Sequence, residues 1–174
     1  RYEHFDQLVG SVKRSDPRHS HSEVDDFLPA INITYKTNTV SNLRLSASQT
    51  VVRPEFRELT NFTFYDFEVG GGVVGNSQLK RTKITNLDLR YEIYPRAGEL
   101  FTLGVFYKQF DNPIEQFLNQ TGPTSFSFNY GNVDEATGYG VEFEMRKKLD
   151  FIEALKNFTF QTNLSYIYNE VKDD

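Results

Sequence analysis

The stretch Thr85-Asn-Leu-Asp-Leu-Arg-Tyr-Glu-Ile93 decides the fold class, because apolar and polar residues alternate along it without a break. Successive side chains on a β-strand point to opposite faces of the sheet. One face therefore carries Leu87, Leu89, Tyr91 and Ile93, and the opposite face carries Asn86, Asp88, Arg90 and Glu92. This period of two predicts a β-strand with one apolar face.

The same alternation, stronger or weaker, returns along the chain and predicts an all-β protein of about seven long strands. The other predicted strands span residues 1–12, 31–35, 43–51, 101–107, 139–145 and 158–168. Several of them exceed the five or six residues of an average globular strand. A strand that crosses a bilayer needs roughly 9 to 11 residues, so the lengths suit a transmembrane β-barrel.

The connections between the strands alternate strictly between short and long. Residues 36–41, 95–98 and 148–157 form shorter connections, whereas the region before residue 29 and residues 53–81 and 111–135 are long. An antiparallel up-and-down meander with turns at one end and long loops at the other is the layout of an outer-membrane barrel. In such a barrel the polar face lines the lumen, which predicts these lumen-facing residues: Asn86, Asp88, Arg90, Glu92, Glu142, Glu144 and Arg146.

Composition and charge exclude several classes of function. The chain has 174 residues with a formal charge of −5, which argues against a nucleic-acid binder. It has no cysteine, so a disulfide scaffold and thiol chemistry are excluded. No apolar run reaches the length of a membrane-spanning helix. The only methionine is Met145 and the first residue is Arg1, so we expect a processed chain or a piece of a longer protein.

Three motifs suggest chemistry, and each has a simpler interpretation. Gly70, Gly72 and Gly75 have the spacing of a dinucleotide loop, but no strand-helix-strand unit surrounds them, and a flexible hinge is favoured. A possible metal-binding cluster consists of His19, His21, Glu23, Asp25 and Asp26. Nothing in the sequence fixes these side chains against one another, so a solvated loop is favoured. We predict no metal and no cofactor.

Glu142 and Glu144 lie two residues apart on one strand face, roughly 7 Å from each other, which falls in the range used by glycosidases. A small β-rich hydrolase is therefore one hypothesis. No second element supplies a positioning partner, and the sequence contains no nucleophile elbow. We predict no catalytic residues and no enzyme activity.

The long connection 53–81 is the predicted ligand-contact region. Pro54, followed by acidic residues, indicates a short helical turn, and an aromatic-rich segment comes after it. Packing of the rings against one another is the competing interpretation. The predicted contact residues are Arg53, Glu55, Arg57, Phe62, Phe64, Tyr65 and Asp66.

Several ordered segments resemble TonB-dependent outer-membrane receptors. The run Asn42-Leu-Arg-Leu-Ser-Ala-Ser-Gln-Thr-Val-Val-Arg-Pro-Glu-Phe-Arg-Glu-Leu59 resembles a barrel strand that rises into a large extracellular loop. Gly75-Asn-Ser-Gln-Leu-Lys80 is similar to the far end of that loop, with Ser77 where the family commonly has Pro. Three further runs are similar to family strands: Phe27-Leu-Pro-Ala-Ile-Asn-Ile-Thr-Tyr35, Phe106-Tyr-Lys-Gln-Phe-Asp-Asn-Pro-Ile-Glu115 and Tyr139-Gly-Val-Glu-Phe-Glu-Met145.

The resemblance implies that residues 1–174 are part of a 22-stranded barrel, without the N-terminal plug and the TonB box. It further implies an outer-membrane transporter that imports a metal chelate, a cobalamin or an oligosaccharide with energy from TonB. The implied partners are outer-membrane lipid, the imported ligand and, through the missing N-terminal part, TonB. The alternative is a secreted soluble β-sandwich that binds carbohydrate or protein, because a sandwich also buries one face of each strand.

Overall fold

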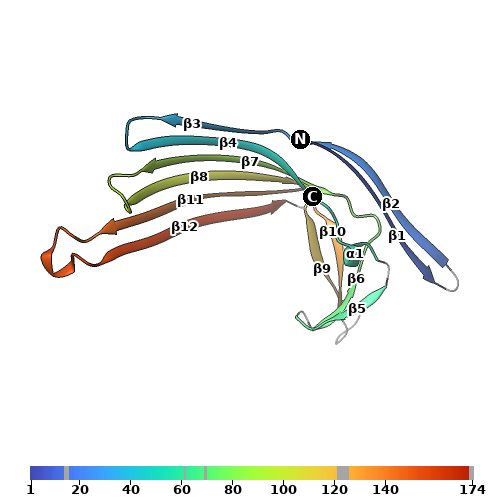
Figure 1. Ribbon diagram of the computed structural model, residues 1–174. Helices are drawn as coiled ribbons and strands as arrows, with labels where there is room; N and C mark the ends of the chain where they lie inside the picture. Colours follow the sequence, from blue (N-terminus) through green and yellow to red (C-terminus); the bar gives the residue numbers. More distant parts are fainter. Residues whose placement is uncertain (14–15, 61, 69, 121–125, 173–174) are drawn as a thin grey trace.

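The computed structural model describes residues 1–13, 16–60, 62–68, 70–120 and 126–172. Its main feature is a curved six-stranded sheet in which all neighbouring strands are antiparallel (Figure 1). The strand order is β12-β11-β8-β7-β4-β3. The strands are β3 (Ala30–Lys36), β4 (Ser41–Val52), β7 (Thr82–Ile93), β8 (Leu100–Asp111), β11 (Glu135–Lys148) and β12 (Thr159–Lys172). The predicted all-β meander is confirmed.

The predicted N-terminal strand exists but does not belong to the main sheet. β1 (Tyr2–Lys13) pairs with β2 (Asp16–Phe27) in a separate antiparallel hairpin, and β2 was not predicted. Only Leu28 and Pro29 separate β2 from β3. The backbone N–H of Leu28 donates to the carbonyl of Arg1 (2.7 Å), and that of Gln49 donates to the carbonyl of Pro29 (2.9 Å). The extended chain therefore changes its partner here, from β1 to β4.

The register places the apolar side chains of neighbouring strands on one face of the main sheet. One row across the sheet runs Ile33, Leu45, Leu89, Val105, Val141 and Tyr166. Leu45, Leu89 and Val105 keep 45%, 41% and 45% of their surface exposed. A sandwich would cover this face with a second sheet, so the exposure contradicts the sandwich alternative. The residues that follow these in each strand point to the opposite face, which is mainly polar.

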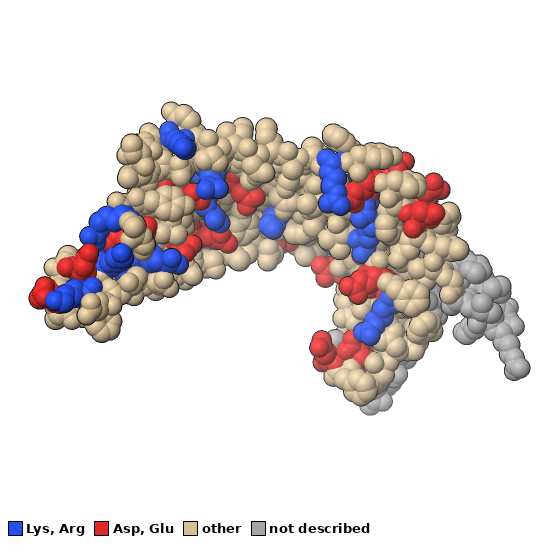
Figure 2. Space-filling view, viewed as in Figure 1, with Lys and Arg blue, Asp and Glu red and all other residues tan. Residues whose placement is uncertain are grey.

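The three short connections lie together at one end of the sheet and the two long ones at the other, as predicted (Figure 1). Lys and Arg side chains gather beside Asp and Glu at the turn end, on the left of Figure 2. There the Arg96 guanidinium lies 2.7 Å from the buried Glu99 carboxylate and 2.9 Å from Asp150. Lys147 Nζ lies 3.0 Å from Glu99. These ion pairs join the β7–β8 turn to the β11–β12 connection, which contains a short 3₁₀ helix (Glu153–Leu155).

The long connections contain secondary structure that was not predicted. β5 (Thr63–Asp66), β6 (Gly71–Val74), β9 (Ile114–Gln120) and β10 (Phe126–Asn132) form a second, four-stranded sheet in the order β5-β6-β10-β9. The pairing of β6 with β10 is parallel and joins the two connections. The sheet lies on the concave side of the main sheet (Figure 1). We refer to this four-stranded sheet as the loop sheet.

The structure contains the predicted helical turn after Pro54 but not the predicted glycine hinge. Helix α1 (Phe56–Leu59) begins two residues after Pro54, and Glu55 forms its N-terminal capping box with Glu58. Gly71 and Gly72 belong to β6, so they are not a hinge. A Cβ atom at Gly75 would lie 2.2 Å from the Thr60 carbonyl oxygen. Only glycine fits this close approach between the two halves of the loop.

The few buried apolar side chains lie in the hairpin and the loops and not under the main sheet. In the described part of the chain they are Val9, Leu59, Val73 and Val133. The main sheet is therefore a single layer with two open faces. Among the described residues, helices are all too short and too polar to span a bilayer.

Candidate functional site

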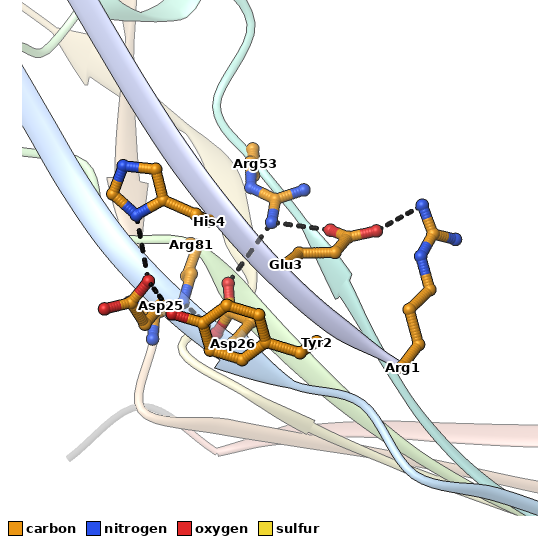
Figure 3. A network of polar contacts seen from close by, with 8 residues as sticks. All are labelled: Arg1, Tyr2, Glu3, His4, Asp25, Asp26, Arg53 and Arg81. Atoms are coloured by element: carbon orange, nitrogen blue, oxygen red, sulfur yellow. Dashed lines mark hydrogen bonds and ion pairs between the residues drawn. The ribbon is translucent and has the colours of Figure 1, made fainter.

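A network of charged side chains connects the β1–β2 hairpin to both ends of the connection 53–81 (Figure 3). Asp26, at the end of β2, is 1% exposed. One of its carboxylate oxygens accepts a hydrogen bond from Arg81 Nε at 2.8 Å, and the other accepts one from Arg53 Nη2 at 3.3 Å. Arg53 directly follows β4 and Arg81 directly precedes β7. One buried carboxylate thus holds three segments together.

Arg53 makes further contacts that fix its guanidinium. Its Nη2 donates to Glu3 at 2.9 Å, and Glu3 also lies 2.5 Å from Arg1. The guanidinium carbon lies 4.4 Å from the centre of the Phe5 ring. Arg53 Nε is buried and has no hydrogen-bond partner among the described residues. The Arg53 side chain therefore serves mainly to dock the hairpin on the loop.

A cavity of about 520 Å³ lies beside this network, between the hairpin and the connection 53–81. Four cationic residues line it: Arg53, Lys80, Arg81 and Lys83. The one acidic residue in the described lining is Asp111, and the apolar part includes Phe5, Leu59 and Leu79. Asp26 and Glu3 neutralise the two arginines. Neither lysine forms an ion pair with a described residue, although Asp111 lies directly opposite Lys83 in the register. This cavity, called here the cationic cavity, therefore keeps an excess of positive charge and suits an anion with an apolar part.

The opposite face of the hairpin carries two histidine–carboxylate pairs. Asp25 accepts a hydrogen bond from the Tyr2 hydroxyl at 2.7 Å and contacts His4 Nδ1 at 2.9 Å. The hydrogen bond to Asp25 raises the pKa of His4, and the bonds from Tyr2 and His4 lower the pKa of Asp25. His21 Nε2 lies 2.8 Å from Asp6.

These contacts divide the His/Asp/Glu cluster singled out in the sequence. Asp25 and His21 have different partners, and Asp26 faces the arginines on the other side of the hairpin. The side chain of His19 lies outside the described part of the structure. No group of three or more possible ligand residues in the described part has the geometry of a metal site.

Most of the predicted ligand-contact residues line a shallow pocket of about 610 Å³ beside α1 and β5. The pocket brings together Arg57, Phe62, Phe64, Tyr65 and Asp66, with Phe56, Thr60, Phe67 and Glu68. The Arg57 guanidinium carbon lies 5.0 Å from the centre of the Phe64 ring. The Tyr65 and Phe67 rings meet edge to face at 5.0 Å. Arg53 and Glu55 do not line this pocket.

The predicted lumen-facing residues share the polar face of the main sheet. In the register Asp88, Arg90 and Glu92 of β7 lie on the same side as Glu142, Glu144 and Arg146 of β11. Arg90 lies 3.4 Å from Glu142, across Gly104, and Arg44 lies 2.8 Å from Glu92. Asn86 donates to Thr50 at 3.3 Å. These ion pairs surround a hollow of about 250 Å³ on that face.

The sheet, its open apolar face and its one-sided loops match a known family over the whole chain. The family model of the TonB dependent receptor-like β-barrel matches residues 1–174. The chain belongs to the TonB-dependent receptor family. Members of this family are outer-membrane transporters and not enzymes, which confirms the predictions of location and of no enzyme activity. None of the curated proteins compared with the chain matches it.

Solved structures of siderophore and hemophore receptors share the fold. The siderophore receptor PirA from Pseudomonas aeruginosa superposes with a TM-score of 0.70 at 18% identity, over 89% of this chain and 30% of that one. A mutant ferric enterobactin receptor PfeA from Pseudomonas aeruginosa, in complex with enterobactin, gives 0.64 at 20% identity, over 87% and 24%. The Serratia marcescens hemophore receptor HasR, in complex with HasA and heme, gives 0.61 at 10% identity, over 97% and 29%. The chain thus spans less than a third of each receptor.

The central members of the charged network, Asp26 and Arg81, could not be identified as partners from the sequence. Asp26 drew attention only as a possible metal ligand, and Arg81 only as a loop boundary. Both lie at the ends of elements whose partners are distant in the sequence: Asp26 is 27 residues from Arg53 and 55 from Arg81. The available signal was the concentration of Lys and Arg in residues 80–83, where the loop ends and β7 begins.

Proposed function

We propose that the chain forms part of the barrel wall and the outer mouth of a receptor that imports an anionic metal chelate, with energy from TonB through another part of the protein. The cationic cavity carries this proposal. Its two lysines form no ion pair within the described part of the chain, and its apolar residues suit the organic part of a chelate. The similar structures named as siderophore receptors support the same class of ligand. Cobalamin and oligosaccharides have less support, because neither requires a cluster of cations.

In this proposal the two faces of the main sheet have different surroundings. The row containing Leu45, Leu89 and Val105 meets lipid, since apolar side chains exposed in this way are stable in a bilayer. The ion pairs of Arg44 with Glu92 and of Arg90 with Glu142 face the water-filled lumen. The long connections then extend on the cell exterior.

The proposed ligand contacts in the cationic cavity are lysines, and not Arg53, which was the candidate from the sequence. Arg53 is engaged with Glu3 and Asp26, so it supports the wall of the cavity. Lys80, in the connection before β7, contacts the anion. Lys83 lies at the loop end of β7, on the same face as Leu87 and Leu89, and adds its charge from that side of the sheet. The aromatic pocket beside α1 remains a second proposed contact surface, through Tyr65 and its neighbours.

The test uses the full-length receptor with the double substitution Lys80→Gln and Lys83→Gln. An exposed ion pair contributes up to about 1 kcal/mol, so we expect roughly tenfold weaker binding of an anionic ferric chelate and reduced uptake of radioactive iron. The matched control is Lys156→Gln, because Lys156 lies in the connection at the opposite end of the sheet. Unchanged affinity in the double variant contradicts the assignment of the cationic cavity.

A second pair of substitutions, Phe64→Ala and Tyr65→Ala, tests the aromatic pocket. Weaker chelate binding with unchanged thermal stability assigns the rings to the ligand. Unchanged binding with lowered thermal stability leaves the rings a structural role only. The contact of Arg57 with the Phe64 ring is an example of such a role.

A further inference from the structure

We propose a second binding site, for an organic cation with an apolar body, in a cleft between the polar face of the main sheet and the start of the loops. The cleft has a volume of about 520 Å³. It lies under α1 and the first residues of β9, and it is separate from the cationic cavity, with which it shares only Arg53. This site goes beyond the proposed chelate import and does not depend on it.

The floor of the cleft is an apolar strip at the loop end of the mainly polar face. Ile84, Phe110, Ala136 and Val171 are direct neighbours in the register across four strands. Since they occupy the same face as Arg90 and Glu142, they point into the same open space. Pro113 and Ile114 add apolar surface from the loop side. No other described residue covers this apolar patch, and such a patch beside charged residues favours a ligand that covers it.

The rim of the cleft is acidic. Its glutamates are Glu55, Glu58, Glu115 and Glu170. Glu58 accepts a hydrogen bond from the backbone N–H of Glu55 at 2.8 Å, and this bond leaves its negative charge in place. Glu170 directly precedes Val171 of the apolar strip in β12, so its side chain points to the opposite face of the sheet. The negative charge of the cleft therefore comes mainly from the three glutamates of the loops.

The charge of the described lining is not balanced by cations. Arg53 is the one cationic residue there, and its guanidinium is engaged with Glu3 and Asp26 on the hairpin. Carboxylates near an apolar surface attract a cation and repel an anion. The combination therefore selects an ammonium or guanidinium group attached to an apolar body. An anionic chelate fits the cationic cavity and not this cleft.

The test measures two matched probes on the full-length receptor in non-ionic detergent. The cationic probe is 4-phenylbutylammonium, and 4-phenylbutyrate has the same apolar body with the opposite charge. Isothermal titration at low salt should give saturable binding of the cation, and the anion should not compete with it. Raising the salt concentration to about 0.5 M should weaken the binding, because charges near solvent are screened.

The decisive variant combines Glu58→Gln with Glu115→Gln. Glutamine at position 58 still accepts the capping hydrogen bond, so α1 should keep its structure. We expect roughly tenfold weaker binding of the cation from the loss of two near-surface charges. Glu153→Gln is the control, because Glu153 lies at the turn end of the sheet. Its affinity for the cation should equal that of the unmodified receptor.

Three results overturn the proposal: no saturable binding of the cation, equal binding of the anionic probe, or unchanged cation affinity in the double variant. Chelate binding by the same variant separates this site from the proposed function. The glutamate variant should keep full affinity for the ferric chelate, whereas the variant of Lys80 and Lys83 should keep full affinity for the cation. Either proposal can thus fail while the other stands.

Discussion

Replacing Asp26 with Asn should release the β1–β2 hairpin from the loops. Asn keeps the shape of the side chain but removes the charge that Arg53 and Arg81 share at 3.3 Å and 2.8 Å. Removing one partner of a fully buried ion pair costs about 3 to 5 kcal/mol. The two arginine side chains keep 21% and 25% exposure, so water compensates part of the loss. We expect a local destabilisation of about 2 kcal/mol.

Hydrogen exchange measured on the full-length receptor tests this value. A loss of about 2 kcal/mol corresponds to roughly 30-fold faster exchange of the backbone amides in β1 and β2. The control is Asp6→Asn, because Asp6 lies on the opposite face of the same hairpin with an exposed contact to His21. Exchange that rises less than threefold in Asp26→Asn, or equally in both variants, refutes the assignment of Asp26 as the central contact.

Three further predictions concern the main sheet, the turn end and the loop. Leu89→Arg should destabilise the intact barrel by about 2 to 4 kcal/mol in unfolding from lipid vesicles, because it places a charge on the lipid face, whereas Asp88→Asn on the opposite face should cost much less. The ion pair with Arg96 lowers the pKa of Glu99 to about 2 from 4.5, so its stabilising effect is complete above pH 4.5 and is lost as the pH falls towards 2. Hydrogen exchange of the turn amides should accelerate in that window, and it should not do so in Glu99→Gln. Gly75→Ala should disrupt the loop, since the new Cβ atom would meet the Thr60 carbonyl oxygen at 2.2 Å, and proteolysis of the connection 53–81 measures this directly.

The main sheet could be predicted from the sequence because its order arises from local patterns. The alternation of Leu87, Leu89 and Tyr91 with charged residues sets the faces of β7, and the short connections force neighbouring strands to be antiparallel. The same alternation is expected in a barrel and in a sandwich. Only the open apolar face of the structure and the match to the family separated the two.

The loop region could not be predicted because its order depends on contacts between distant segments. β6 consists of Gly-Gly-Val-Val, which has no alternation, and it pairs both with the preceding β5 and, in parallel, with β10 more than 50 residues later. The Asn132 amide donates to the carbonyl of Lys80 and also accepts from the Lys80 N–H. No local signal marks such a pair, since an asparagine in a loop normally indicates only a turn.

Arg53 lies between the cationic cavity and the acidic cleft, so a substitution of this residue cannot distinguish the two proposed sites. It lines both the cationic cavity and the acidic cleft, and it also anchors the hairpin through Asp26. A substitution of Arg53 would therefore change the electrostatics of both spaces and release the hairpin at once, so any loss of binding would have three explanations. Lys80 with Lys83 on one side, and Glu58 with Glu115 on the other, each belong to one space only. Opposite responses of these two pairs to anionic and cationic probes would demonstrate that the two spaces on either side of Arg53 are separate binding sites.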